Sequence, residues 1–386
     1  MKPLVSILIP AYNAERWIAQ SIQSAIGQTW QRKEIIVVND GSTDRTAEIA
    51  RGFGPRVTVV STENQGVSAA ENLAIRISQG DYIQYLDADD ILKPDKIGRQ
   101  LAVLREGDSR RILLSSQWAP FYYRTRYARF VHNSLCQDLS PVEWLLRKMK
   151  ENVHMQTSTW LTSRELIEAA GPWDTQLATD QDGEYFCRVL MASEGTRFVS
   201  GTGVFYRMTG PNRVSQIGSS ETKRESLLCS MKAHIQCLRS LEDSERVREA
   251  CLKYMQNWYH EFYPSRPDLV AAMQSMAAQL QGHLEKPRLR WKYIWMKPVL
   301  GWKTARRAQW AIPYLKQSCM RNFDKFMHLL EAHGASLVVK PSKNSSQKAD
   351  PLESLGENSE FEDTEGFQDS LSPSDDRSTT VRRGPP

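Results

Sequence analysis

The chain has 386 residues, of which 40% are hydrophobic and 25% are charged, and its formal net charge is +5 at pH 7. This composition is typical of a soluble globular protein and excludes a wholly disordered chain or an integral membrane protein. No apolar run is long enough to span a bilayer, and the short run from Leu4 to Pro10 fits a core strand better than a signal peptide. The six cysteines lack metal-ligand spacing, so we expect reduced thiols and a cytoplasmic location.

The first hundred residues alternate between strand and helix patterns. Strands are predicted by apolar runs at 5–9, 34–38, 57–60 and 82–86. Helices are predicted at 15–29 and 68–79. A further helix, capped by Ser42 or Thr43, is predicted to end at Ala50. This order predicts an α/β fold, with a mainly parallel, Rossmann-like sheet covered by helices on both faces.

A polar loop follows each of the four predicted strands. The residues concerned are Pro10, Tyr12 and Asn13, then Asp40 and Ser42, then 63–66, and finally Asp87, Asp89 and Asp90. The carboxyl ends of parallel strands meet at one edge, so these loops are expected to converge on one crevice. Neighbouring carboxylates repel unless a hard cation such as Mg²⁺ or Mn²⁺ neutralises them, and such ions commonly bind substrate phosphates. The alternative is a solvated acidic turn in which Asp89 or Asp90 caps a helix.

Beyond residue 100 the pattern is less regular. A basic and aromatic stretch at 118–132 fits either strands or a loop, and residues 157–161 are predicted to form a strand. Ser163 opens a predicted helix that ends at Gly171, and the acidic group 180–184 opens another through Met191. After Arg213 the chain is predicted to be helical and amphipathic to about residue 281.

These patterns divide the chain into a domain at 1–215, a helical region at 216–335 and a disordered tail at 336–386. Within the helical region, residues 286–325 contain eleven Lys or Arg residues and one acidic residue, Asp324, with aromatic residues interleaved. Peripheral contact with the inner face of a cell membrane is one interpretation of this mixture. A helical subdomain with an aromatic core is the other. Without a recognition module, no nucleic acid is expected as a partner.

Residues 3–215 resemble the family 2 glycosyltransferases, which have the GT-A fold. The resemblance is carried by four motifs in order, at 5–13, 34–44, 64–68 and 80–90. It implies an inverting enzyme that moves one sugar from a nucleoside diphosphate sugar to a hydroxyl acceptor. The acceptor would be a growing surface glycan or a lipid-linked saccharide.

The resemblance also implies roles for individual residues. Tyr12 would stack on the nucleotide base in a loop shaped by Pro10, and Asp40 would accept hydrogen bonds from the base. Asn13 and Ser42 complete this predicted nucleotide site. Asp89 would hold Mn²⁺ or Mg²⁺, and Asp87 would contact the ribose or share the metal. Asp182 would be the base that removes the acceptor proton, with Asp180 and Glu184 as rivals.

Three departures from the family pattern keep other functions open. Gln181 replaces the usual acid beside Asp182, Glu71 stands where relatives commonly carry Arg, and the Gln-x-x-Arg-Trp signature of processive synthases is missing. The missing signature favours transfer of a single sugar. The alternatives are a sugar nucleotidyltransferase, which would need a Gly-rich loop after the first strand, and a non-catalytic carbohydrate-binding protein that retains the fold.

Overall fold

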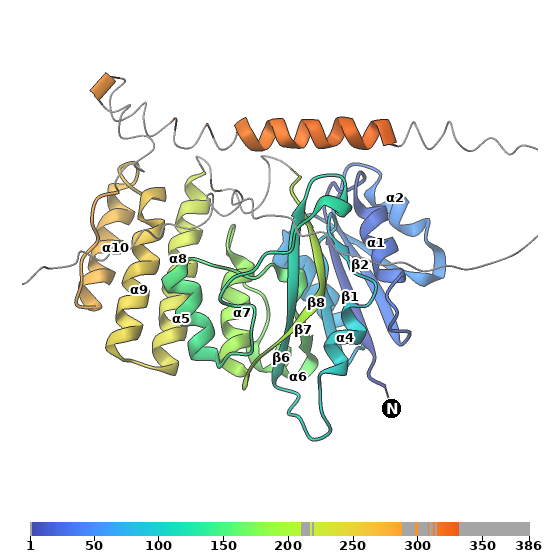
Figure 1. Ribbon diagram of the computed structural model, residues 1–386, viewed down its shortest axis with the longest axis horizontal. Helices are drawn as coiled ribbons and strands as arrows, with labels where there is room; N and C mark the ends of the chain where they lie inside the picture. The colour runs from blue at the N-terminus through green and yellow to red at the C-terminus, as the bar shows by residue number, and fades with distance from the viewer. Residues whose placement is uncertain are drawn as a thin grey trace, which may run out of the picture. The chain divides into compact units, whose positions relative to one another are not determined.

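The computed structural model describes residues 2–209, 217, 220–287, 298–299, 308, 312 and 315–331. Two compact units are present, residues 1–291 and 292–386. The first unit contains an eight-stranded sheet in the order β3-β2-β1-β4-β7-β6-β8-β5 (Figure 1). Its strands are β1 Val5–Ala11, β2 Lys33–Asp40, β3 Thr58–Thr62, β4 Tyr82–Tyr85, β5 Ile91–Leu92, β6 Ile112–Phe121, β7 Leu161–Ser163 and β8 Gly195–Arg207. The helices are α1 Ile18–Ile26, α2 Thr46–Arg51, α3 Val67–Ile77, α4 Lys96–Ala102, α5 Pro141–Glu151, α6 Arg164–Ala170, α7 Gln181–Ala192, α8 Glu221–Leu241, α9 Glu245–Trp258 and α10 Pro267–Gln279.

The amino-terminal half of the sheet is parallel, because strands and helices alternate there. β1 is completely buried and pairs in parallel with β2 on one side and β4 on the other, and β3 extends the sheet beyond β2. The chain moves along the sheet from β1 to β2 to β3, and then returns past β1 to form β4. Right-handed crossovers therefore place α1 and α2 on one face of the sheet and α3 on the opposite face. The order therefore changes direction between β1 and β4, where open α/β sheets bind their ligands.

The rest of the sheet mixes the two orientations. β7 runs antiparallel to β4 and β6, β8 runs parallel to β6, and the short β5 pairs antiparallel with β8. The predicted fold class is confirmed: the sheet is mostly parallel and helices pack on it, followed by a helical region. Part of the basic stretch 118–132 forms the end of β6, and a 3₁₀ turn, Thr125–Tyr127, lies within it.

Two local predictions are wrong. Neither Ser42 nor Thr43 caps α2, which begins at Thr46 without a side-chain cap, because both residues bond to Asn13 instead. The strand predicted at 157–161 is a 3₁₀ turn, Thr157–Thr159, followed by β7. The side chain of Gln156 accepts a hydrogen bond from the Ser158 backbone and so starts that turn.

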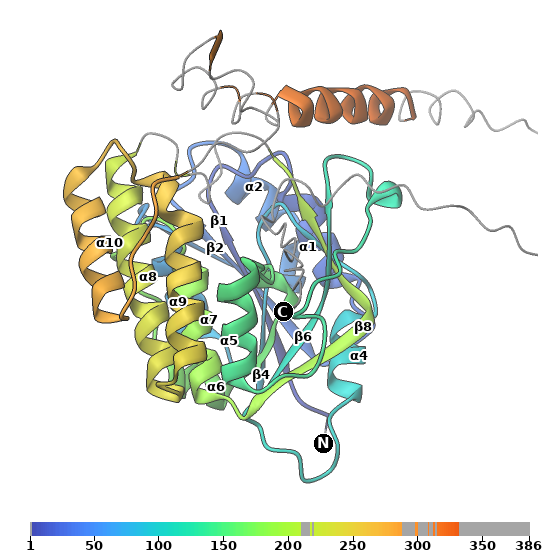
Figure 2. The same ribbon diagram turned by 60° about the vertical axis from the view of Figure 1, so that its left-hand side comes forward.

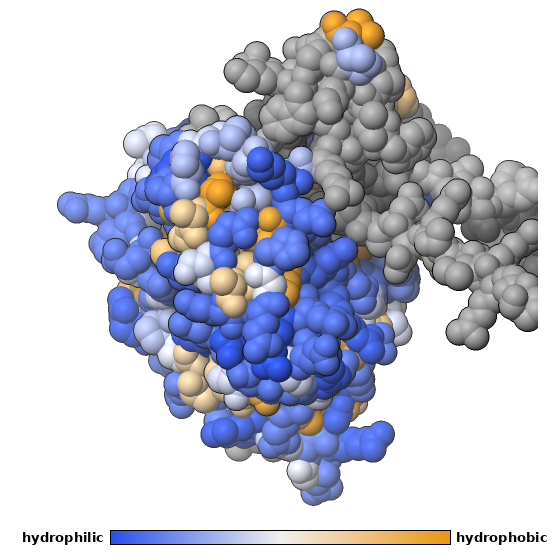
Figure 3. Space-filling view, turned by 90° about the vertical axis from the view of Figure 1, so that its left-hand side faces the viewer, coloured by the Kyte–Doolittle hydropathy of each residue, from blue (hydrophilic) through white to orange (hydrophobic). Residues whose placement is uncertain are grey.

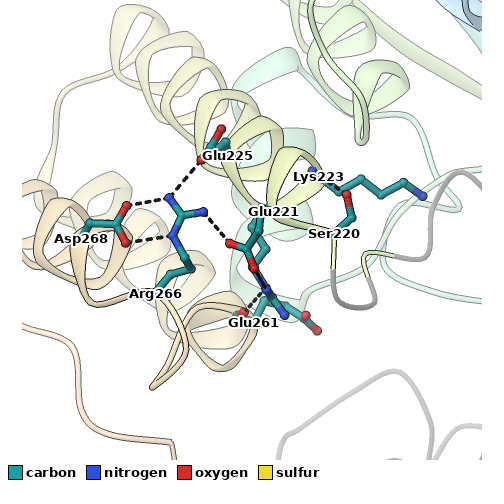
Figure 4. Close-up of polar contacts among 8 residues, drawn as sticks. Ser220, Glu221, Lys223, Glu225, Glu261, Arg266 and Asp268 are labelled. Atoms are coloured by element: carbon teal, nitrogen blue, oxygen red, sulfur yellow. Dashed lines mark hydrogen bonds and ion pairs between the residues drawn. The ribbon is translucent and has the colours of Figure 1, made fainter.

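Helices α8, α9 and α10 stand beside one another next to α5 (Figures 1 and 2). Their buried residues, such as Met231, Ala250, Tyr254 and Met273, form the helical part of the core. At the start of α10, Arg266 bonds to Asp268 and also reaches α8 (Figure 4). This contact ties the two helices together at their ends.

The predicted domain boundary at 215/216 falls inside the unit 1–291 and stays a prediction. The predicted tail at 336–386 lies outside the described residues, as does most of 286–325. Among the helices that the structure describes, none combines the length and the apolar character needed to cross a membrane.

Candidate functional site

The loops after β1 and β2 are tied together by side-chain bonds. Asn13 has a left-handed backbone, with φ of 48°, and its Oδ1 accepts a hydrogen bond of 2.9 Å from the Thr43 backbone. In return the backbone N–H of Asn13 donates to Ser42 Oγ, at 2.9 Å. Pro10 is buried within β1, whereas Tyr12 is 53% exposed. The loop is thus held by its polar residues while the tyrosine ring stays accessible for stacking.

Asp40, at the end of β2, holds the loop after β3. Its Oδ1 accepts from the backbone N–H of Gln65 at 2.8 Å, and its Oδ2 accepts from that of Gly66 at 2.9 Å. The side chain is only 4% exposed. Gly66 has φ of 90°, which favours glycine, and α3 begins at the next residue. Asp40 therefore fixes the entry to α3 beside Tyr12.

The acidic cluster lies just after β4. Asp90 is fully buried, and its carboxylate accepts from the Arg207 backbone N–H at 2.8 Å and from Gln156 Nε2 at 2.8 Å. The same Gln156 nitrogen donates to Asp87 Oδ2 at 3.0 Å. One amide thus bridges two carboxylates of the cluster, while Asp87 and Asp89 remain partly accessible. This separates Asp90, as a structural residue, from the other two.

Arg207, the last residue of β8, closes the cluster from the other side. Its Nε donates to the backbone oxygen of Asp89 at 2.7 Å, and Nη2 donates to Gln20 Oε1 at 2.6 Å. The guanidinium is 4.2 Å from the centre of the Trp17 ring. The side chain is 1% exposed, and burial lowers its pKa to about 10 despite the charges of Asp89 and Asp90. Arg207 therefore stays cationic at neutral pH and fixes the backbone of the acidic loop.

The carboxylates at this site act on one another. Burial, followed by the charges of Asp89 and Asp182, raises the pKa of Asp87 from 3.8 to about 7. Burial, followed by the charges of Asp89 and Asp87, raises the pKa of Asp90 well above its ordinary value. Carboxylate oxygens held close together form a donor set of the type that Mg²⁺ and Mn²⁺ prefer. Within the described residues, no group of three or more His, Cys, Asp or Glu side chains is placed to hold a metal ion by itself. An ion here would need further ligands, as an ion bound to a diphosphate has.

Asp182 lies at the start of α7 and faces the acidic cluster. Its Oδ2 accepts from Thr157 Oγ1 at 3.2 Å, and its charge is close enough to raise the pKa of Asp87. The residue keeps solvent access, yet surrounding protein and the charge of Asp180 raise the pKa of its own carboxyl. The charge of Lys148, on α5, lowers the pKa of Asp182. The 3₁₀ turn after Gln156 therefore connects Asp182 to the cluster at β4.

The two rivals of Asp182 have other partners. Both oxygens of Glu184 bond to the guanidinium of Arg188, at 2.6 and 2.9 Å. Asp180 accepts from Ser230 Oγ at 2.6 Å, and its Oδ2 lies 3.9 Å from His234 Nδ1 on α8. The Asp180 contacts attach the start of α7 to α8, the Glu184 contact lies within α7, and Asp182 is the most accessible of the three carboxylates.

Glu71 is buried within α3, where it is 2% exposed. Burial, and next the charge of Asp87, raise the pKa of its carboxyl well above the ordinary value. Both effects favour the protonated form of the Glu71 carboxyl. Its Oε2 has no hydrogen-bond partner within the described part of the chain.

Several residues of this site carry no sequence signal. Gln156 and Thr157 precede a short strand, and Arg207 ends a long one, so only the folded chain brings them to the acidic residues. A surface hollow lined by Lys2, Thr29 and Trp30 lies at the opposite edge, near the amino ends of β1 and β2. It is therefore separate from the candidate site.

Comparisons with known proteins agree with this arrangement. Residues 6–157 match the model of glycosyl transferase family 2. An uncharacterised glycosyltransferase of Rickettsia typhi is 40% identical over 112 residues, which make up 29% of this chain and 35% of the relative. Chondroitin synthase of Pasteurella multocida is 45% identical over 98 residues, or 25% of this chain and 10% of the synthase. The match thus spans about a third of the Rickettsia relative and a tenth of the synthase.

The fold is shared with a solved structure. Residues 1–349 of S. aureus TarS, in complex with UDP-GlcNAc, superpose with a TM-score of 0.58 and 15% identity. The superposition covers 72% of this chain and 81% of that one. At this identity it shows the fold alone. The match of residues 6–157 to the model of glycosyl transferase family 2 confirms the predicted resemblance to that family.

Proposed function

We propose that this protein is a metal-dependent inverting glycosyltransferase that moves a single sugar from a nucleoside diphosphate sugar to a hydroxyl acceptor. The observation that carries the proposal is that two neighbouring residues join Asp182 to the β4 cluster: Thr157 Oγ1 donates to Asp182 and Gln156 Nε2 donates to Asp87. A base and a diphosphate anchor would then lie on two sides of one reacting centre. The family 2 match over residues 6–157 supports the reaction class.

The donor nucleotide would lie at the switch point between β1 and β4. Tyr12 would stack on the base through its exposed ring, and Asp40 would accept from the base while it holds the loop after β3. Asn13 and Ser42 would maintain the shape of this pocket, with Pro10 fixing the end of β1. Asp87 would face the ribose or the diphosphate.

A divalent ion, Mn²⁺ or Mg²⁺, would be held by Asp89 and Asp87 together with donor phosphate oxygens. When bound, it would supply positive charge that stabilises the departing nucleoside diphosphate. Gln156 and Arg207 would keep the two carboxylates oriented. Asp90 would not be a ligand, since its side chain is completely buried and is held by Gln156 and the Arg207 backbone.

Asp182 would act as the base. Its raised pKa makes the carboxylate a stronger base, which improves proton transfer from a sugar hydroxyl. Removal of that proton would let the acceptor oxygen attack the anomeric carbon from the face opposite the diphosphate, with inversion. The charge of Lys148 would favour the ionised carboxylate, since it lowers the pKa of Asp182.

The acceptor would be a saccharide or a lipid-linked saccharide in surface polysaccharide or glycolipid synthesis. The chondroitin synthase relative supports a polysaccharide role. A cytoplasmic location and peripheral contact with the inner face of the cell membrane through residues 286–325 complete this proposal.

A thermal-shift screen of UDP-, GDP- and dTDP-sugars, with and without Mn²⁺, tests the donor site. A ligand that binds only the folded state raises the melting temperature, and the largest shift should need donor and metal together. The anomeric configuration of the product then tests inversion. A non-catalytic carbohydrate-binding protein would release no nucleoside diphosphate from any donor, and a nucleotidyltransferase would release pyrophosphate from a nucleoside triphosphate.

A further inference from the structure

Residues 315–331 of the second unit form a helix, drawn in orange-red in Figure 1. At 1.5 Å per residue it is about 25 Å long. Five of its apolar residues follow the 3–4 spacing that places side chains on one face of a helix. They are Leu315, Cys319, Phe323, Phe326 and Leu330.

The apolar face of this helix is exposed. Phe323 is 64% exposed, Leu315 59%, Phe326 58% and Leu330 50%. In a helix that packs on a protein core, such a face would be covered.

The first unit offers a contrast. The surface over α10 and its neighbours is mainly hydrophilic, with small and separate apolar areas (Figure 3). Among the described residues of the first unit, the exposed large hydrophobic side chains are those of Tyr12, Ile77, Tyr127 and Met191, and no two of them lie on one helix. Contiguous exposed apolar surface, as on the helix at 315–331, marks an interaction site.

The charge of the surrounding sequence indicates which partner this face fits. Residues 286–325 carry eleven Lys or Arg residues against Asp324 alone, a local charge of 11 − 1 = +10. Basic residues beside a phenylalanine-rich amphipathic helix suit a surface that is negatively charged at its headgroups and apolar beneath them. A protein groove would satisfy the apolar face but would not account for the excess of positive charge.

We propose that the helix at 315–331 binds the surface of an anionic phospholipid bilayer, with Phe323 and Phe326 inserted below the headgroups. The helix would lie in the plane of the interface, since its opposite face carries Arg321, Asp324 and Lys325. This assignment refines the proposed membrane contact and does not depend on the sugar-transfer reaction.

Co-sedimentation of the full chain with vesicles tests the proposal. Vesicles of phosphatidylcholine mixed with phosphatidylglycerol should bind the protein, vesicles of phosphatidylcholine alone should bind it more weakly, and added salt should reduce binding. The double substitution Phe323→Glu and Phe326→Glu should weaken binding to the mixed vesicles by at least about tenfold, because two buried rings are lost.

The matched control adds the same two negative charges to the other face, through Gln317→Glu and Ser318→Glu. It should reduce binding much less than the Phe323 and Phe326 pair does. Equal loss in both variants, or no binding by the unaltered chain, would overturn the proposal. If light scattering shows that the phenylalanine pair instead holds two copies together, the face is a dimer interface and the proposal is also wrong. Retention of the donor-induced thermal shift in both variants shows that the first unit is intact.

Discussion

Two clusters of charge in this molecule are built in opposite ways. Around Arg266, one guanidinium serves three carboxylates, those of Asp268, Glu221 and Glu225 (Figure 4). At the end of β4, Asp87, Asp89 and Asp90 gather with Asp182 nearby, and Arg207 is the cation that holds their loop. The first cluster lowers the pKa of Asp268 to about 2 through its bond to Arg266, whereas the second raises the pKa of Asp87 to about 7.

The difference shows what burial does to a group of carboxylates. Each carboxylate around Arg266 bonds to the guanidinium and is more than half exposed, so water screens the remaining negative charge. At the end of β4, burial and neighbouring charges make ionisation of Asp87 and Asp90 costly. Carboxylates with raised pKa values are typical of functional sites.

The largest expected effect is on activity. Asp89→Asn removes a carboxylate from the proposed metal site and should lower the rate of transfer by roughly 100-fold or more at the Mn²⁺ concentration that saturates the unaltered enzyme. The measurement is a titration of transfer rate against Mn²⁺. An unchanged titration curve would remove Asp89 from the site. Asp268→Asn, in the other cluster, is the control and should leave the curve unchanged.

The next effect is on stability. Arg207→Met removes the buried guanidinium and leaves the backbone oxygen of Asp89 and the side chain of Gln20 without their donor. The free energy of unfolding should fall by roughly 3 kcal/mol, as for other buried charges that lose a partner. Urea denaturation measures this change. A loss below about 1 kcal/mol would mean that Arg207 does not hold the acidic loop.

A smaller effect is a gain in stability. Without metal, Asp87→Asn should stabilise the protein by about 1 kcal/mol, because it removes a buried carboxylate that faces like charges. The pKa of Asp87 is raised, so the folded state binds this proton more tightly than the unfolded chain. The cost of ionisation therefore appears as the pH rises from about 4 to about 7. Melting temperatures in a chelator should show the largest gain above pH 7 and none below pH 4. A gain that does not vary with pH would contradict this explanation.

The smallest effect is expected at the paired cluster. Arg266→Met should lower the free energy of unfolding by less than about 1 kcal/mol, since the carboxylates of Glu221, Glu225 and Asp268 are more than half exposed. The loss should shrink further in high salt. A loss of unfolding free energy as large as that in Arg207→Met would contradict the distinction between the two clusters.

Much of the fold could be predicted from the sequence, because strand and helix patterns alternate clearly in the first hundred residues. The runs that form β1 and β2 were predicted to within about two residues at each end. The turn at Thr157–Thr159 was predicted as a strand, because its β-branched residues favour one and the bond from Gln156 cannot be read from spacing.

From the strand pattern, the candidate site was predictable only at the ends of the parallel strands, whereas Asp182 on α7 was predicted from the family resemblance. There Asp40 and Asp87 follow apolar runs and must meet at one edge. The partners that orient them, Gln156 and Arg207, come from distant segments. The burial of Glu71, which raises the pKa of its carboxyl, also depends on packing that no local pattern shows.

The central claim, that Asp182 is the base opposite the β4 cluster, is tested most directly by measuring transfer and donor binding in Asp182→Asn. The substitution keeps the size of the side chain and should lower the transfer rate by roughly 100- to 10,000-fold while the dissociation constant of the donor stays nearly unchanged. Glu184→Gln, which alters a carboxylate paired with Arg188, should retain transfer. Full turnover in Asp182→Asn, or a loss confined to Glu184→Gln, would contradict the account.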